Sequence, residues 1–168
     1  MRSRIISFIS VVTVFITVLS KCLPASLLVA EAANETIIVT CQDPTPHYVE
    51  KGTWSASSLP GYNGLGTRYT AENGASAVFR PTLSRGRYVV SYYRVLNSAS
   101  QTASPLTVYH AEGQYTFHFN GTVGAEGWAG LDYYNFADGD SGYVEIESND
   151  PNANLRASAV KFEKVEDA

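Results

Sequence analysis

The sequence is short of charge, cysteine and histidine. Charged residues make up 17% of the 168 positions, and 16 acidic against 12 basic groups give a formal net charge of −4. This balance argues against a nucleic-acid-binding protein, which needs a basic patch to contact phosphates. Two cysteines are too few for a disulfide scaffold or a four-thiolate zinc site. The aromatic content of 12% argues against disorder, and the length allows one domain.

Residues 1–32 have the pattern of an export signal. Arg2 and Arg4 precede an apolar run at residues 5–19, and Ala30-Glu31-Ala32 supplies small residues for cleavage. An uncleaved membrane anchor is the alternative, although the run is shorter than the ~20 residues that span a bilayer. We therefore predict a secreted or cell-surface protein without stable membrane insertion after cleavage. Cys41 is then the one remaining cysteine, and its strand-like surroundings predict a buried structural thiol.

The rest of the chain repeats one pattern, a short alternating apolar run followed by a Gly, Asn, Asp or Pro cluster. This pattern predicts an all-β antiparallel sandwich. The segment at 86–95 is apolar on both faces and predicts a central strand, whereas the Ser-rich segment at 55–66 has the composition of a long loop. The other expected strands are 36–40, a hairpin of 105–110 with 113–120 that turns Tyr115, Phe117 and Phe119 inward, 143–148 and a closing strand at 155–165.

An ordered series of short motifs runs through residues 36–165. They are Gly52-Thr53-Trp54, Gly61-Tyr62-Asn63-Gly64, Arg68-Tyr69, Ala77-Val78-Phe79-Arg80-Pro81, Gly86-Arg87-Tyr88-Val89-Val90, Thr107-Val108-Tyr109-His110, Trp128, Gly142-Tyr143-Val144-Glu145-Ile146 and Ala157-Ser158-Ala159-Val160-Lys161-Phe162. In this order they resemble the golvesin/xanthan-lyase-type carbohydrate-binding-like domain. The resemblance implies a galactose-binding-like jelly-roll fold, usually attached to secreted enzymes, with carbohydrate binding as its role.

The chain departs from that family pattern at three positions. Phe79 replaces the usual Trp, Asp132 replaces a Gly, and Ser158 replaces an Asp. Phe79 keeps an apolar anchor. Ser158 removes a carboxylate, which weakens any metal role at that position.

Nothing in the sequence organises a catalytic centre. The three histidines belong to no metal or nucleophile motif. Glu145 and Glu147 stand two apart on a strand, about 7 Å, a spacing that suits an inverting glycosidase but equally describes a solvated strand face. We therefore predict a protein without catalytic activity.

Recognition of a polysaccharide or glycoconjugate needs flat apolar rings beside amides, carboxylates or Arg. The candidates are Tyr62, Asn63, Arg68, Tyr69, Tyr133 and Tyr134. Trp54 and Trp128 are alternatives, although we expect them to be buried anchors. A second hypothesis for the function is a structural or adhesion module of the cell envelope that contacts other proteins.

Three aspartates are the candidates for a metal site. Asp138, Asp140 and Asp150 could gather around Ca²⁺, which prefers carboxylate and carbonyl oxygens. The alternative is that Asp-Gly-Asp-Ser-Gly at 138–142 is a turn in which Asp and Gly supply the backbone geometry. No other cofactor is expected.

Overall fold

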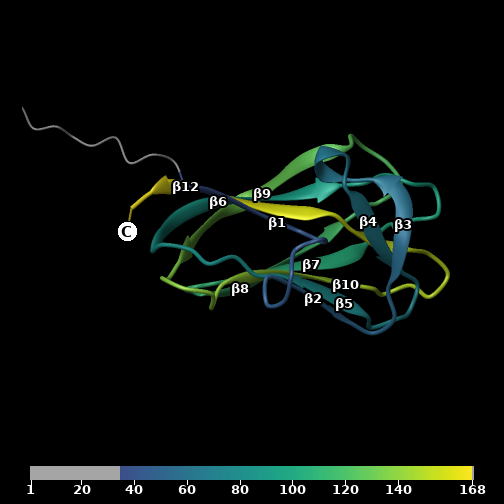
Figure 1. Ribbon diagram of the computed structural model, residues 1–168, viewed down its shortest axis with the longest axis horizontal. Coiled ribbons are helices and arrows are strands. Elements are labelled where there is room, and N and C mark those ends of the chain that lie inside the picture. The colour runs from purple at the N-terminus through teal and green to yellow at the C-terminus, as the bar shows by residue number, and fades with distance from the viewer. Residues whose placement is uncertain (1–34, 168) are drawn as a thin grey trace, which may run out of the picture. The chain divides into compact units, whose positions relative to one another are not determined.

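The computed structural model describes residues 35–167 (Figure 1), so the predicted signal at 1–32 lies outside the described residues. Within that range the chain forms twelve strands and one short 3-10 helix. Their bounds are β1 Thr36–Thr40, β2 Tyr48–Lys51, β3 Ser55–Pro60, η1 Tyr62–Gly64, β4 Gly66–Thr70, β5 Ser76–Phe79, β6 Gly86–Arg94, β7 Ser104–His110, β8 Gly113–Phe119, β9 Gly127–Phe136, β10 Tyr143–Glu147, β11 Leu155–Ala157 and β12 Ala159–Glu166.

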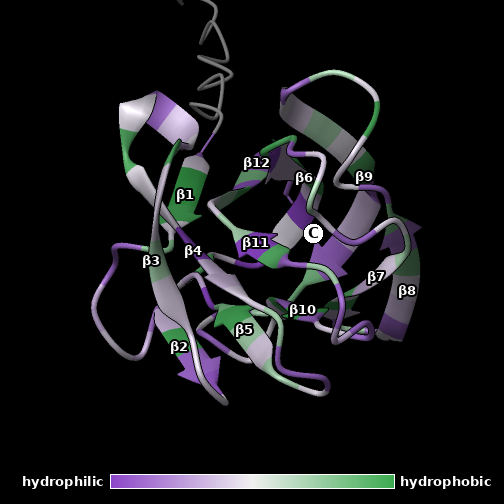
Figure 2. Cartoon of the chain, turned by 90° about the vertical axis from the view of Figure 1, so that its right-hand side faces the viewer, coloured by the Kyte–Doolittle hydropathy of each residue, from purple (hydrophilic) through white to green (hydrophobic). Residues whose placement is uncertain are grey.

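Two antiparallel sheets form the two layers of a sandwich, which confirms the predicted fold class. The four-stranded sheet has the order β1-β12-β6-β9, and the five-stranded sheet has the order β2-β5-β10-β7-β8. A third sheet of order β11-β4-β3, called here the end sheet, lies across one end of the sandwich, and Figure 2 looks onto that end. In the described part of the chain, no helix has the length and apolar character needed to cross a membrane.

The core lies between the two larger sheets because each strand turns alternate side chains inward. Tyr88 and Val90 of β6 and Phe162 of β12 are fully buried, as are Leu106 of β7 and Ile146 of β10 on the opposite layer. The strand predicted at 86–95 is indeed central, since β6 pairs with β12 on one side and β9 on the other. The 105–110/113–120 hairpin is also confirmed as β7 and β8.

Three local predictions were wrong. The segment at 55–66 is not a loop throughout, because its first part, Ser55–Pro60, is β3, which pairs with β4 despite the Ser-rich composition; residues 61–65 connect the two strands. The closing strand is divided at Ser158 into β11, which joins the end sheet, and β12. Tyr115 stands opposite Val108 on the inner side of β8 but is 56% exposed, because β8 is the edge strand of its sheet.

The expected buried anchors have different outcomes. Cys41 is buried, as predicted, and burial raises the pKa of its thiol. Trp54 is also buried, and its indole Nε1 donates a hydrogen bond to the Lys51 carbonyl at 3.1 Å. Trp128 is only half-buried, so its assignment as a core residue was wrong.

Candidate functional site

Tyr62 and Asn63 lie in η1, against the outer face of the four-stranded sheet. The Tyr62 ring is 5.0 Å from the Trp128 ring and 5.7 Å from the Tyr93 ring, measured between centroids. We call these three residues the aromatic cluster. Asn63 is exposed, with a left-handed φ of 56° that suits Asn in a tight turn. The mutual packing of the three rings explains why Trp128 is half-buried here rather than in the core.

The other predicted sugar-binding residues are dispersed. The Arg68 Nε and Nη2 atoms each donate a 2.7 Å hydrogen bond to Glu50, which occupies the guanidinium and raises its pKa. Tyr133 is 53% exposed on β9, whereas its neighbour Tyr134 is 8% exposed and belongs to the core. Tyr69 lies on β4 in the end sheet. The structure therefore does not bring the six candidates together.

The three aspartates do not form the calcium site that the sequence suggested. The Asp138 carboxylate accepts a hydrogen bond from the Arg85 backbone N–H at 2.7 Å, and the Asp150 carboxylate accepts one from the Asn152 N–H at 2.9 Å. Asp140 uses its backbone carbonyl to accept from Arg80. Within residues 35–167 no group of three or more His, Cys, Asp or Glu side chains is arranged to hold a metal. The bond from Asn152 to Asp150 is the local kind that the turn alternative predicts, whereas the bonds of Asp138 and Asp140 join residues 53 and 60 positions apart.

Tyr69 lines an open hollow at the end of the sandwich, called here the end hollow. Its volume is about 480 Å³, and its walls come from the end sheet and the adjoining loops. The lining is mostly polar, with one aromatic ring and one guanidinium. The lining residues are Ala56, Ser57, Ser58, Leu59, Tyr69, Asn97, Asn154 and Arg156.

Arg156 faces the end hollow because of strand alternation. Its neighbours Leu155 and Ala157 are buried, so the residue between them points to the other side of β11. The guanidinium carbon lies 5.5 Å from the Tyr69 ring centroid, and the Nε and Nη1 atoms donate to the hydroxyls of Ser100 and Ser57 at 3.1 and 3.2 Å. Burial lowers the pKa of this guanidinium, although it remains protonated.

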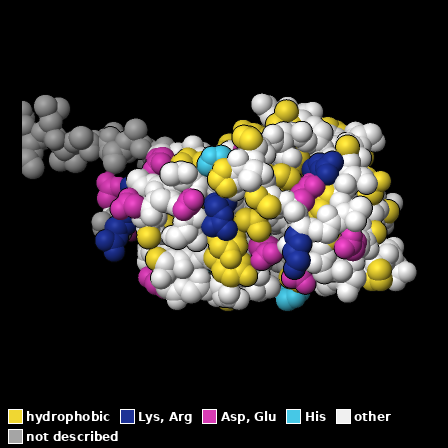
Figure 3. Space-filling view, turned by 60° about the horizontal axis from the view of Figure 1, so that its bottom comes forward, with side chains coloured by type: hydrophobic (Ala, Val, Ile, Leu, Met, Phe, Trp, Pro, Cys, Tyr) yellow, Lys and Arg dark blue, Asp and Glu magenta, His cyan; other side chains and the backbone are white. Residues whose placement is uncertain are grey.

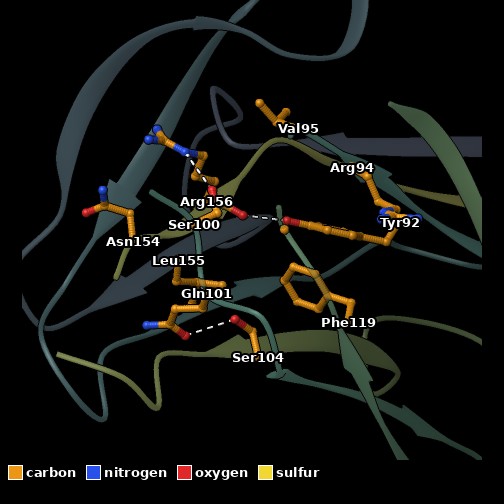
Figure 4. A pocket seen from close by; sticks show the side chains of 11 residues that line it. Tyr92, Arg94, Val95, Ser100, Gln101, Ser104, Phe119, Asn154, Leu155 and Arg156 are labelled. Carbon is orange, nitrogen blue, oxygen red and sulfur yellow. Dashed lines mark hydrogen bonds between the residues drawn. The ribbon is translucent and has the colours of Figure 1, made fainter. Parts of the chain in front are cut away.

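Gln101 holds the loops that carry Asn154. Its Nε2 donates to the Ser148 hydroxyl at 2.8 Å and to the carbonyls of Asp150 and Ala153 at 2.9 and 3.2 Å. Its backbone N–H donates to the Asn154 carbonyl at 3.0 Å. Because Asn154 is fixed through its backbone, its side chain is free to extend outward, to the same side as Arg156 and away from Tyr92 (Figure 4).

A small cavity lies beneath the end hollow. It is lined by residues that include Tyr92, Gln101 and Phe119 (Figure 4), and its volume is about 10 Å³. That volume is close to the space that one water molecule needs, so no sugar ring fits inside. The end hollow above it is the candidate functional site.

Sequence reasoning identified Tyr69 but missed Asn97, Asn154 and Arg156. These residues come from the loop after β6, the turn before β11 and β11 itself. The alternation of Leu155, Arg156 and Ala157 indicated that the Arg156 side chain points away from the core. Nothing in the sequence indicated which strand would pair with this segment. The pairing of β11 with β4 places Arg156 opposite Tyr69.

Comparison with known proteins shows which family has this architecture. The model of the Golvesin C-terminal domain matches residues 37–164. The chain belongs to this family. A solved xanthan lyase from Paenibacillus is similar to this golvesin-type domain at 26% identity and a TM-score of 0.71, covering 77% of this chain and 13% of the lyase. The chain therefore spans only a small part of that enzyme's length. Comparison with curated proteins finds no match.

Two further solved structures show the same fold. The CBM35 from Cellvibrio japonicus Abf62 has 17% identity and a TM-score of 0.55, covering 80% of this chain and 95% of its own. A family 35 carbohydrate-binding module from Clostridium thermocellum has 14% identity and a TM-score of 0.54, covering 76% and 97%. The golvesin-type domain thus has the fold of carbohydrate-binding modules, the galactose-binding-like sandwich that the motifs predicted.

Proposed function

We propose that this golvesin-type domain is an exported, non-catalytic module that binds a polysaccharide or glycoconjugate in the end hollow. The observation that carries the proposal is the lining, in which the Tyr69 ring stands beside the Arg156 guanidinium and the amides of Asn97 and Asn154. Family membership and the shared fold support it. The leader pattern of residues 1–32 supports a secreted or cell-surface location.

The chemistry of the lining suits a sugar ring. The apolar C–H face of a pyranose packs on an aromatic ring, while its hydroxyls exchange hydrogen bonds with amides, hydroxyls and guanidinium groups. Leu59 and Ala56 add apolar surface to the same wall, and Ser57 and Ser58 add hydroxyls. Such an open site recognises one or two sugar units at the surface of a polymer rather than enclosing them.

The same lining supports a binding role over a catalytic one. None of the eight residues that line the end hollow is His, Cys, Asp or Glu, so the hollow lacks a histidine or a pair of carboxylates for acid–base catalysis, and Tyr69 is its one side chain of a type that can act as a general acid or base. Glu145 lies elsewhere, on β10, where its carboxylate accepts a hydrogen bond from the Tyr109 hydroxyl at 3.4 Å.

The structure offers less support for a protein-contact module. On the side shown in Figure 3, a group of apolar side chains lies near the middle of the face, with basic and acidic side chains directly beside it. The Tyr109 and Tyr143 rings stack with centroids 4.2 Å apart, and the Arg80 guanidinium carbon lies 4.1 Å from the Tyr143 ring centroid. The exposed large apolar side chains stand on separate strands and loops: Val49, Leu65, Tyr115, Val123, Tyr133 and Val165.

The proposal is tested by affinity electrophoresis through gels that contain neutral or acidic polysaccharides. We expect Tyr69→Ala and Asn154→Ala each to weaken retention about tenfold, the effect of losing roughly 1.4 kcal/mol of binding energy. Tyr133→Ala is the matched control, because it removes an exposed tyrosine on β9, away from the end hollow. Circular dichroism shows whether each variant is folded.

Two results would contradict the proposal. One is retention on no polysaccharide in the panel. The other is loss of retention in Tyr133→Ala while a folded Tyr69→Ala variant binds normally, which would move the site to β9.

A further inference from the structure

The charge of the end hollow is positive and is not neutralised within its walls. Arg156 is the one charged residue among the eight that line it, and the other seven are neutral. This is notable in a chain with 16 acidic and 12 basic residues. Among the described residues, Arg68 pairs with Glu50 at 2.7 Å and Arg87 with Glu166 at 3.6 Å. The side chains of Arg80 and Arg94 instead donate to backbone carbonyls, and Arg156 donates to serine hydroxyls.

The hydrogen bonds of Arg156 leave donors available for a ligand. Nε donates to Ser100 Oγ, and Nη1 uses one hydrogen for Ser57 Oγ. The remaining hydrogens are one on Nη1 and both on Nη2. Since the two serine partners are neutral, they orient the guanidinium without cancelling its charge.

A partly buried cation without a paired carboxylate is stabilised when an anion enters its site. A planar guanidinium with two adjacent free donor nitrogens matches the two oxygens of a carboxylate, as an ammonium group does not. Asn154 and Asn97 stand in the same lining and can hydrogen-bond the hydroxyls of a sugar that carries the carboxylate.

We propose that the end hollow selects acidic glycans, with Arg156 binding the carboxylate of a uronic acid unit. This inference rests on the proposed function and names the substrate class of the same site. The negative net charge of the chain works against non-specific attraction of polyanions, so selection of an acidic polymer would have to come from a local group.

The test compares each acidic polymer with its own neutral form. The probes are polygalacturonate, alginate and glucuronoxylan, each beside its carboxyl-reduced counterpart, with dextran and dextran sulfate as a further pair. We expect the chain to bind at least one uronate polymer about tenfold more tightly than its reduced form, which has the same backbone without the charge. This preference should shrink as salt rises, because the contacting charges are partly exposed.

Three variants assign the preference to Arg156. Arg156→Gln should remove the difference between the acidic and the reduced polymer while leaving residual binding to both. Arg156→Lys should restore part of it, since the charge returns without the planar pair of donors. Arg85→Gln is the control, since it removes an equal charge from an exposed residue that does not line the end hollow. Arg85 lies just before β6, whereas the loop that carries Asn97 follows the other end of that strand. The preference of Arg85→Gln should equal that of the parent.

The outcomes separate this inference from the proposed function. Equal binding of acidic and reduced polymers by the parent overturns the selection of carboxylates and leaves glycan binding standing. Equal or tighter binding of dextran sulfate would show general polyanion attraction and also overturns the inference. Binding of none of the polymers overturns the proposed function itself. The comparison of acidic with reduced polymers uses the parent chain, so it remains decisive if Arg156→Gln does not fold.

Discussion

Gln101 illustrates how much depends on one polar side chain in this sandwich. It is 1% exposed and uses both ends of its amide, donating to Ser148, Asp150 and Ala153 while accepting from the Ser104 hydroxyl at 2.9 Å. A buried polar group stabilises a fold only when its partners are all present. Here the satisfied amide ties the loop after β6 to the turn before β11, and so fixes two walls of the end hollow.

We therefore expect Gln101→Ala to lower the free energy of unfolding by about 3 kcal/mol, because buried donors and acceptors lose their partner. Ser104→Ala removes only one of these hydrogen bonds and should cost about 1 kcal/mol. Urea unfolding of both variants measures the difference. Equal costs for the two changes would show that Gln101 does not organise the loops.

At the scale of elements, η1 is attached to the four-stranded sheet through side chains. The Tyr62 backbone N–H donates to the Ser158 hydroxyl at 2.9 Å, and the Tyr62 ring packs in the aromatic cluster. Gly61 allows this close approach, since a Cβ there would stand 2.3 Å from the Ser158 Oγ. Ser158, which departs from the family pattern, therefore has a structural role in holding η1.

The aromatic cluster predicts a graded effect of truncation. Because Trp128 is half-buried, we expect Trp128→Ala to destabilise the fold by about 2 kcal/mol, less than the 3–5 kcal/mol typical of a large core aromatic. Phe162→Ala, at a fully buried position, is the comparison and should show the larger cost. Thermal unfolding of the two variants ranks them, and a larger loss in Trp128→Ala would contradict the assigned burial.

At the scale of the whole molecule, the sandwich buries several of the 11 tyrosines of the chain. Burial, together with the charge of Asp132, raises the pKa of Tyr134 from 10.0 to about 12. Burial also raises the pKa of Tyr92, whose hydroxyl donates to the Arg156 carbonyl. These phenols stay protonated in the folded chain at a pH where they would ionise in the unfolded chain.

A folded pKa above the unfolded value gives stability that is complete below pH 10.0 and is lost as the pH rises toward 12. We expect the free energy of unfolding to fall steeply across this window. Urea titrations at each pH, with tyrosinate absorbance as a second readout, measure it. Tyr134→Phe should flatten the fall, since the phenol that ionises only on unfolding is gone. A free energy of unfolding independent of pH in this window would contradict the burial of these rings.

The sequence alone determined the fold class and the main strands. Alternation of apolar residues records which side of a strand meets the core, so β6, the β7/β8 hairpin and β10 were visible in it. The sequence also identified the family, because motifs such as Gly86-Arg87-Tyr88-Val89-Val90 contain the residues that pack in this sandwich and occur in the order typical of the family. Turn chemistry was equally local, and it explains the hydrogen bond from the Asn152 N–H to the Asp150 carboxylate.

The tertiary structure alone decided the composition of the candidate site. Tyr62 and Tyr69 stand seven positions apart, yet the crossing of β3 and β4 over the end of the sandwich sends Tyr62 to the aromatic cluster and Tyr69 to the end hollow. Arg156 reaches Tyr69 only through the pairing of β11 with β4, a contact between segments far apart in the chain. Local patterns encode which face of a strand is buried, but long-range strand pairing determines which exposed side chains become neighbours.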